Sequence, residues 1–509
     1  MVTYNNRRSL GISIFLLVVV GAFLLMGVGP THAKDRFILG IPGAPYTFHP
    51  WDMAQNNSPN HPQFYNRLII LDKQLKPHAE IATEWNYSPD GKIFTMKLRQ
   101  DVKFHTGKQL TSEDVKRSWL QITKGKFVGS HANLKPLAKL IAEIRTPDPY
   151  TAELIYENPN PAVFDFLDLF YIVDMDQWDL HMKQPIGTGP YLMKEYIPGD
   201  RTVLVANTEY WGKIPKIKEL VYRVIPDPQA LVLNLESGTV DGIIFFPSRE
   251  ANRLEKKGLK VYVANPDGVV FDLLYNVTYG PLKDKRVRQA INMMINRNRF
   301  HRVIMGGMGD VRCLPWPNQS LAYDADMDDL CKFDPEKAKQ LITEAGYPDG
   351  FEVELQTCTQ MAVEQVKMAE MLQADLKRIG VRVKVLDKER AGYQATYRAK
   401  KYQLSTHNFG RGNKDPASLY GTATVWKSKG NTQNYWNPEY DGLIKKASST
   451  LDVDKRKEIY GQLNKMLLDE MFISAVHTKP RYFAHKKEFK NIGSSVDGFM
   501  YFFNMEYQP

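Results

Sequence analysis

Residues 77–115, PHAEIATEWNYSPDGKIFTMKLRQDVKFHTGKQLTSEDV, join a strand pattern directly to a helix start. Within them, residues 93–99 alternate apolar and polar side chains, which is typical of a half-buried strand. Thr111 then begins Thr-Ser-Glu-Asp, a capping box in which Asp114 can bond back to the first residue of the motif. Both adjacent carboxylates lie where a helix dipole favours negative charge. The acidic pair therefore has a structural explanation and does not by itself indicate an active site.

The second half of the chain also alternates strands and helices. Residues 334–347 begin with Asp-Pro and carry a glycine near their end, which predicts a helix with a defined start and stop. A strand at 351–357, a helix at 362–379 and a strand at 381–386 are predicted to follow. Strand, helix and strand at this spacing indicate a βαβ unit with parallel strands. A further helix is predicted over 284–305, and the fold class is therefore α/β.

The first 33 residues have the composition of an export signal. Two arginines precede an uncharged apolar run from Leu10 to Val28, and Gly-Pro-Thr-His-Ala follows it. We therefore predict that residues 1–33 are a signal peptide, cleaved after about Ala33. The run is also long enough to cross a bilayer, so an uncleaved anchor is the open alternative.

Length and composition indicate ordinary globular material in the rest of the chain. With 509 residues in total, it is too long for one compact core and suits two or three lobes. It is 43% hydrophobic and 24% charged, as in average soluble domains. The formal net charge is +10, but the basic residues are scattered, so we expect no nucleic-acid partner. An anionic ligand or an acidic partner stays open.

The cysteine count excludes a disulfide-dense scaffold, because the chain has only three. In an oxidising compartment, Cys313 and Cys331 could pair across the loop between them. Cys358 would then remain alone, and we expect it to be buried.

No catalytic or metal-binding motif is recognisable in the sequence. It contains no HExxH zinc helix, paired CxxC, Walker phosphate loop or GxSxG nucleophile elbow. His49 and His61 bracket a polar loop, but their spacing is a weak metal signal. We therefore expect no catalytic residue, no metal site and no cofactor. An exported α/β hydrolase is the alternative, because catalytic groups can assemble from distant positions.

Six segments, taken in order, resemble the bacterial extracellular solute-binding proteins of family 5, the peptide and nickel receptors of ABC importers. The first is the block at 77–115, and the others are PIGTGPY (185–191), NTEYWG (207–212), LNLESGTVDG (233–242), GPLKDKRVRQAINMMINR (280–297) and FDPEKAKQLITEAGY (333–347). The resemblance implies a periplasmic, monomeric receptor. It also implies that the receptor delivers a small-molecule or peptide ligand to an ABC permease and its ATPase complex in the inner membrane.

The resemblance also implies an architecture. It predicts a two-lobed periplasmic binding protein clamp of type II, cluster C-like, with an extra subdomain. Lobe I would combine 34–62, 184–272 and 478–509, the inserted subdomain would cover 63–183, and lobe II would cover 273–477. The ligand would lie between the lobes, whose closure would bury it.

The predicted ligand site departs from the family pattern. Peptide receptors of the family commonly hold the peptide amino terminus with an aspartate four residues before a proline, where this chain has Gly412 before Pro416. Asp415 matches the acidic residue directly before that proline. Residues 356–365 lack the arginine that takes the peptide carboxylate in dipeptide receptors. The ligand is then either a longer peptide held by main-chain bonds or a non-peptide solute such as an opine, a sugar conjugate or a metal chelate.

The candidate ligand-binding residues supply aromatic walls and one anion-binding group. Arg411 would suit an anionic group of the ligand through bidentate hydrogen bonds. The aromatic residues would provide apolar walls or stacking surfaces. The full set predicted from the sequence is Tyr46, His49, Trp51, Phe409, Gly410, Arg411, Asp415 and Trp426.

Overall fold

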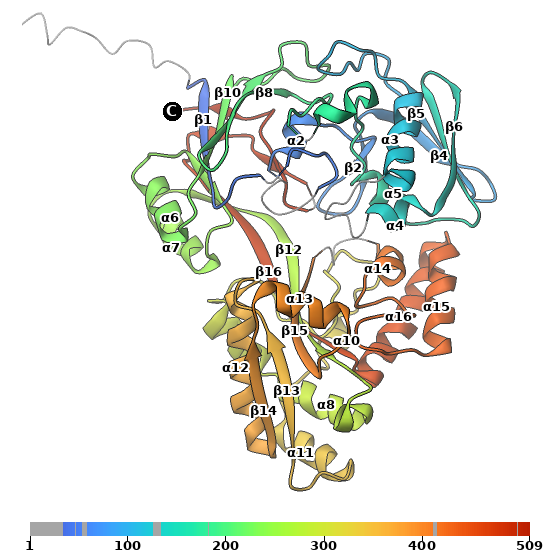
Figure 1. Cartoon of the computed structure of the whole chain (residues 1–509), viewed down its shortest axis with the longest axis vertical. Coiled ribbons are helices and arrows are strands. Elements are labelled where there is room, and N and C mark those ends of the chain that lie inside the picture. The colour runs from blue at the N-terminus through green and yellow to red at the C-terminus, as the bar shows by residue number, and fades with distance from the viewer. Residues whose placement is uncertain are drawn as a thin grey trace, which may run out of the picture.

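The computed structural model describes residues 34–45, 47–52, 59–125, 134–181, 183–410, 415–495 and 497–509. The predicted signal peptide, Tyr46, Arg411 and Gly412 lie outside these residues. Among the described residues, no helix is long and apolar enough to cross a membrane. The described chain forms an upper and a lower body joined by long strands (Figure 1).

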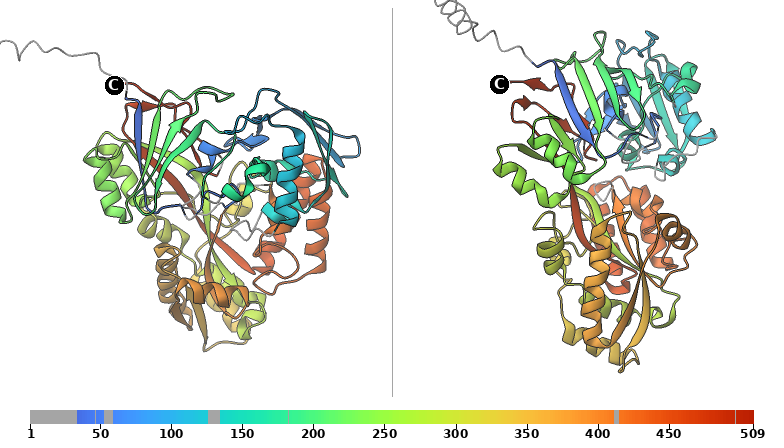
Figure 2. Two further views of the ribbon diagram at one scale, coloured as in Figure 1. Left: turned by 45° about the horizontal axis from the view of Figure 1, so that its top comes forward. Right: turned by 60° about the vertical axis from the view of Figure 1, so that its left-hand side comes forward.

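A mixed sheet of ten described strands runs through both bodies, in the order β14-β13-β15-β12-β16-β11-β1-β10-β9-β8. Two strands are far longer than the others, β12 with 16 residues and β16 with 13. Each belongs to both bodies, and Figure 2 shows them crossing from one to the other. The strands are β1 (Arg36–Ile41), β8 (Tyr191–Ile197), β9 (Arg201–Ala206), β10 (Glu219–Val224), β11 (Gly242–Ile244), β12 (Lys260–Tyr275), β13 (Phe351–Thr357), β14 (Val381–Asp387), β15 (Leu404–Gly410) and β16 (Ile473–His485).

The lower body is lobe II, built from β13, β14, β15 and the adjoining ends of β12 and β16. Strands β13 and β14 are parallel and are joined through a helix, which confirms the predicted βαβ unit. Its helices are α8 (Lys285–Met293), α9 (Arg297–Arg299), α10 (Ala325–Asp328), α11 (Pro335–Glu344), α12 (Val363–Leu376), α13 (Arg390–Arg398), α14 (Pro416–Thr422), α15 (Pro438–Ser449) and α16 (Val453–Glu470).

The helix predicted over 284–305 is wrong in its second half, because α8 ends at Met293. The side chain of Asn296 accepts a hydrogen bond from the backbone N–H of Arg299 at 2.9 Å and begins α9. A π-helical turn over Phe300–Ile304 follows. An asparagine that bonds to nearby backbone competes with a continuous helix, so the apolar spacing alone misjudged the length.

The upper body contains lobe I and, beside it, the inserted subdomain. Lobe I holds β1, β8 to β11 and the other ends of β12 and β16, with the helices α6 (Pro228–Glu236) and α7 (Ala251–Lys256). The short elements of the upper body are α2 (His61–Phe64), β2 (Ile69–Leu71), β3 (Pro77–Ala79), β17 (Phe489–Lys490), β18 (Gly493–Ser494), β19 (Met500–Tyr501) and β20 (Glu506–Tyr507).

The inserted subdomain is an antiparallel sheet of four described strands in the order β4-β5-β7-β6. The alternating pattern of 93–99 forms β5 and the capping box begins α3, which confirms both predictions. The Thr111 N–H donates to Asp114 Oδ2 at 3.0 Å. The elements are β4 (Ala82–Tyr87), β5 (Ile93–Leu98), β6 (Ile141–Asp148), β7 (Thr151–Tyr156), α3 (Ser112–Lys124), α4 (Leu134–Ala138) and α5 (Val163–Leu167).

The buried apolar residues show which parts are packed together. One continuous cluster joins lobe I and the inserted subdomain, from Phe37 in β1 to Phe94 in β5. Lobe II has separate clusters on the two faces of its sheet. The predicted disulfide between Cys313 and Cys331 is present, and Cys358 is free and buried, as expected. The two-lobed α/β architecture is therefore as predicted, while the residue limits given for the lobes stay predictions.

Candidate functional site

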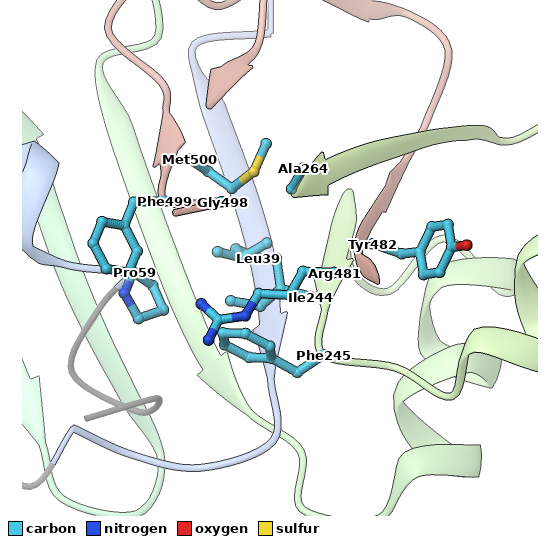
Figure 3. Close-up of a pocket in the computed structure, with 10 residues that line it drawn as sticks. All are labelled: Leu39, Pro59, Ile244, Phe245, Ala264, Arg481, Tyr482, Gly498, Phe499 and Met500. Carbon is cyan, nitrogen blue, oxygen red and sulfur yellow. The ribbon is translucent and has the colours of Figure 1, made fainter. Parts of the chain in front are cut away.

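A pocket lies within lobe I, beside the lobe I ends of β12 and β16 (Figure 3). Its enclosed space is about 10 Å³, which is room for roughly one water molecule. The walls come from β1, β11, β12, β16 and the C-terminal loops. The described lining residues are Leu39, Pro59, Ile244, Phe245, Ala264, Arg481, Tyr482, Gly498, Phe499 and Met500. The lining residues all belong to the parts of the chain assigned to lobe I, so the pocket does not lie between the lobes.

Arg481 is the charged residue among the ten described residues that line this pocket. It stands on β16 opposite Asn265 of β12, and the pairing register shifts on both sides of Asn265. Such irregular pairing bends a strand and re-aims its side chains. The Arg481 Nη1–H donates to the carbonyl oxygen of Asp497 at 3.1 Å. In Figure 3 the guanidinium extends toward the side of the pocket where Pro59 and Phe245 lie.

Phe245 enters the pocket wall from a strained backbone position. It directly follows β11 and has φ of +58°, in the left-handed region that bulky side chains rarely adopt. This conformation costs roughly 1 kcal/mol or more, and such strain is found most often at functional sites. The strained backbone at Phe245, the irregular pairing of β12 with β16 and the Arg481 side chain therefore all border the same pocket.

Two other pockets each lie within one lobe or at its edge. One lies inside lobe II, between β12 and α12, and is lined by residues such as Leu273 and Met368. The other is at the outer edge of lobe I, around Lys34 and Lys486. Neither is lined by residues of both lobes, so none of these three pockets of the described chain is a cleft between the lobes.

Residues 76–431 match the family described as bacterial extracellular solute-binding proteins, family 5 middle. The chain belongs to this family. Family 5 proteins are the solute-binding receptors of ABC importers for peptides and related ligands. The relatives and structural neighbours below are binding proteins, so the prediction that the chain is not an enzyme is confirmed.

Two relatives illustrate the family. The heme-binding protein A of Haemophilus influenzae is 28% identical over 472 residues, covering 84% of each chain. The dipeptide-binding protein of Escherichia coli is 27% identical over 475 residues, covering 86% of each chain.

Solved structures agree with the two-lobed fold. AgaA from A. tumefaciens R10, in complex with agropinic acid, has a TM-score of 0.78 and 25% identity, covering 93% of this chain and 99% of that one. HbpA2 from Haemophilus parasuis has a TM-score of 0.80 and 24% identity, covering 93% of this chain and 100% of that one.

Of the residues predicted for the site of this family 5 protein, His49 and Trp51 are fully buried in the upper body. The Trp51 Nε1–H donates to the carbonyl oxygen of Tyr171 at 2.9 Å. The rings of both residues also pack against Trp178, at centroid distances of 5.0 and 5.5 Å. The structure thus gives both residues a packing role, and ligand contact stays a prediction.

In lobe II, Phe409, Gly410 and Trp426 lie together near the end of β15. Gly410 pairs with Val269 of β12, so this segment lies close to the crossing. The rings of Phe409 and Trp426 meet edge to face with centroids 6.0 Å apart. The buried Trp426 Nε1–H has no hydrogen-bond partner among the described residues, so it could donate to a ligand.

Asp415 serves as the N-cap of α14 and accepts the Ala417 N–H at 2.9 Å. Its carboxylate also pairs with Arg456, at 2.5 Å from Oδ2, and accepts the Tyr460 hydroxyl at 3.0 Å. Its own N–H donates to Asp165 of the subdomain at 2.9 Å. Protein groups therefore already engage this carboxylate, and its predicted role toward a ligand stays untested.

Arg481 and a buried aspartate, Asp272, are the charged groups that the sequence interpretation missed. Asp272 of β12 is fully buried, and neither carboxylate oxygen has a hydrogen-bond partner among the described residues. His407 Nδ1 lies 3.5 Å from Asp272 Oδ2. Burial raises the pKa of Asp272 to about 6, while His407 lowers it. The sequence could have indicated Asp272, because it is the charged residue in the apolar run VVFDLLY (269–275). The segment KPRYFAH (479–485) has mixed composition, so it does not mark Arg481 in the same way.

Proposed function

We propose that this family 5 receptor captures a peptide or peptide-like solute between lobe I and lobe II and delivers it to a membrane permease. The observation that carries the proposal is the family 5 match over residues 76–431, and the two lobes joined by β12 and β16 agree with it. A solute held between the lobes stabilises the arrangement that encloses it, so its binding energy can shift the lobes toward the closed form.

A receptor for a non-peptide solute is the second candidate. Gly412 stands where peptide receptors of the family commonly have an aspartate, and residues 356–365 lack an arginine, so both charge anchors for a short zwitterionic peptide are missing from their usual places. AgaA, solved in complex with agropinic acid, is a structural neighbour of similar overall fold. An opine, sugar conjugate or metal chelate therefore remains in the set of ligands to be tested.

The setting of the proposed function follows from the family. The receptor would work as a monomer in the periplasm, after cleavage near Ala33, with an ABC permease and its ATPase as partners. Lobe I would comprise 34–62, 184–272 and 478–509, the subdomain 63–183 and lobe II 273–477. Family membership and the export-type first 33 residues support this assignment.

The direct experiment is native mass spectrometry of the full chain purified from a periplasmic fraction. We expect a bound solute of peptide-like mass. The protein is then unfolded to release this solute and refolded, and adding the solute back should raise the melting temperature of the refolded protein. Incubation with the solute followed by product analysis should return it unchanged. Turnover of the solute, or stabilisation only by unfolded protein chains, would contradict a receptor function.

A further inference from the structure

A glycine-rich segment, residues 305–310, runs from the core of one lobe to the core of the other. It has the sequence Met-Gly-Gly-Met-Gly-Asp. Met305 is buried in an apolar cluster of lobe II, whereas Met308 packs against the cluster around α6 and α7 of lobe I. The chain therefore makes a non-covalent contact with lobe I three residues after it leaves the core of lobe II.

Hydrogen bonds hold both ends of this segment in place. At its start, the Gly307 N–H donates to the carbonyl oxygen of His301 at 2.9 Å, in the π-helical turn of lobe II. At its end, the Asp310 N–H donates to Thr478 Oγ1, and the Thr478 N–H donates to the Asp310 carbonyl oxygen, both at 2.8 Å. Thr478 lies in β16, which joins the lobes. The segment is therefore fixed to lobe II and to a crossing strand, and Met308 stands between these two anchors.

Gly309 lets the segment lie directly against β16. A Cβ placed on Gly309 would lie 2.4 Å from the Thr478 carbonyl oxygen and 2.8 Å from Pro480 Cδ, so no side chain fits there. Gly307 has nearly the same backbone conformation, with φ of +78° against +84° for Gly309, but a Cβ placed on it would meet nothing within 4 Å. Both conformations favour glycine, and Gly309 in addition needs the absence of a side chain for its contact with the crossing strand.

The Met308 contact and the contact between lobe II and the subdomain lie on opposite sides of the crossing strands. In Figure 1, α6 and α7 stand to the left of β12 and β16, whereas α14, which approaches α4 and α5, stands to the right; the views in Figure 2 keep this order. The hydrogen bond from the Asp415 N–H to Asp165 lies on the right-hand side. A rotation about the crossing strands that separates lobe II from the subdomain therefore pushes Met308 further toward lobe I.

We propose that residues 305–310 are a stop that limits how far the lobes of the receptor open. Opening would press the Met308 side chain into the packed cluster of α6 and α7, and close-packed protein interiors resist such compression. The inference rests on the proposed function as a two-lobed receptor, and it adds the element that sets the widest angle between the lobes. It does not depend on which solute is bound.

A limited opening angle would help the receptor to bind its solute. Binding must supply the free-energy difference between the ligand-free arrangement of the lobes and the closed one. When the lobes are kept from opening far, fewer open arrangements compete with the closed form, so a larger fraction of the receptor is ready to close. The stop and the contact of Asp415 with Asp165 would then bound the lobe movement at its two ends.

The test measures the distance between the subdomain and lobe II in the full chain without solute. Nitroxide labels at Lys139→Cys and Lys446→Cys report this distance, because both positions are exposed and the native cysteines are disulfide-bonded or buried. Met308→Ala removes most of the side chain that meets lobe I and should shift the distance distribution toward longer values. Gly309→Ala should do the same, because its Cβ forces the segment away from β16.

Two matched variants separate the stop from general effects of substitution. Met308→Leu keeps an apolar side chain of similar size and should retain the wild-type distribution. Gly307→Ala introduces similar backbone strain to Gly309→Ala but faces open space, so it should also retain this distribution. The melting temperature of each variant reports folding, and Met308→Ala decides the question if Gly309→Ala is unstable.

The outcomes separate the stop from the receptor function. An unchanged distribution in Met308→Ala, or a shift to shorter distances, would overturn the stop and leave the proposed function intact. Equal shifts in Gly307→Ala and Gly309→Ala, with none in Met308→Ala, would assign the effect to backbone strain and also overturn the stop. A single wild-type distance that no co-purified solute changes would contradict closure of the lobes around a solute, which is part of the proposed function.

Discussion

At the crossing, lobe II is joined to lobe I by the continuous backbones of β12 and β16. On the other side of the molecule, lobe II meets the inserted subdomain through non-covalent contacts alone. We call this second contact the latch, defined by Asp165 and Gly91 of the subdomain and by Asp415, Leu451 and Arg456 of lobe II. Figure 1 shows it as the place where α14 approaches α4 and α5.

The two contacts respond differently to movement of the lobes. Strand pairing at the crossing persists at any lobe angle, because the backbone is continuous. The hydrogen bond from the Asp415 N–H to Asp165 at 2.9 Å exists only when subdomain and lobe II are close. The crossing is therefore the connection about which the lobes can move, whereas the latch sets part of the free-energy difference between the open and closed forms.

The largest effect is expected at the lobe II side of the latch, from Arg456→Met. The pair is largely buried, with side chains 7% and 15% exposed, and the change leaves the Asp415 carboxylate without its ion-pair partner at 2.5 Å. Removing one member of a buried pair costs about 3–5 kcal/mol of stability. Denaturant unfolding should show this loss, and the double variant with Asp415→Asn should recover part of it. Full stability of Arg456→Met would show that the pair is not needed to hold α14 in place.

The second prediction probes the crossing strand through Asp272→Asn. The folded-state pKa of Asp272, about 6, lies above its unfolded value, so the folded protein holds the proton more tightly. This contribution to stability is present at low pH and is lost as pH rises from about 4 to about 6. Asp272→Asn should remove the decline and be more stable than wild type at pH 8, by about 3 kcal/mol.

The control for Asp272 is His407→Gln, because His407 lowers the pKa of Asp272. Without His407 the pKa of Asp272 should be higher, so the stability of His407→Gln should decline more steeply above pH 6 than that of the wild-type protein. Unfolding curves recorded between pH 4 and pH 8 measure both variants. Parallel pH profiles for wild type and Asp272→Asn would mean that a partner of Asp272 compensates its charge.

The third prediction concerns the subdomain side of the latch. Asp165→Ala removes the oxygen that accepts the Asp415 N–H and should disfavour the closed form by about 1 kcal/mol. Fluorophores on the subdomain and on lobe II should report a larger mean distance. Asp165→Asn retains an acceptor oxygen and serves as the matched control. An unchanged distance in Asp165→Ala would show that this hydrogen bond of the latch does not contribute measurably to the free energy of closure.

The smallest effect is expected from Leu451→Ala. A Cβ placed on Gly91 would lie 2.5 Å from Leu451 Cδ1 and 3.2 Å from Pro159 Cβ, so these residues are already in close contact. Leu451 is 37% exposed, and its truncation should weaken closure by about 0.5 kcal/mol. The same distance measurement should detect a small shift, with denaturant stability of lobe II unchanged. A shift larger than that of Asp165→Ala would make apolar packing the main component of the latch.

Features encoded in a few neighbouring residues were predictable from the sequence. The capping box at Thr111, the strand at 93–99, the βαβ unit and the Cys313–Cys331 pair all depend on local spacing, and each was confirmed. The length of α8 was misjudged because one asparagine, Asn296, formed a local hydrogen bond instead of continuing the apolar spacing.

The charged groups of the site could not be predicted in the same way. Arg456 lies far along the chain from Asp415, and only the packing of α16 against α14 and its loop brings the pair together. Arg481 stands in a strand whose sequence is mixed, so nothing marks it as facing a pocket. Its position depends on how β12 and β16 pair across an irregular register, which is a property of the assembled sheet.

The single apolar cluster shared by lobe I and the inserted subdomain has a consequence for engineering. Deleting the subdomain would expose residues of lobe I such as Phe48 and Trp51, which are buried in that cluster. Large newly exposed apolar surfaces promote aggregation. The insertion is therefore not a removable module. A shortened receptor with the same solubility would need polar residues in place of the lobe I side chains that now contact the subdomain.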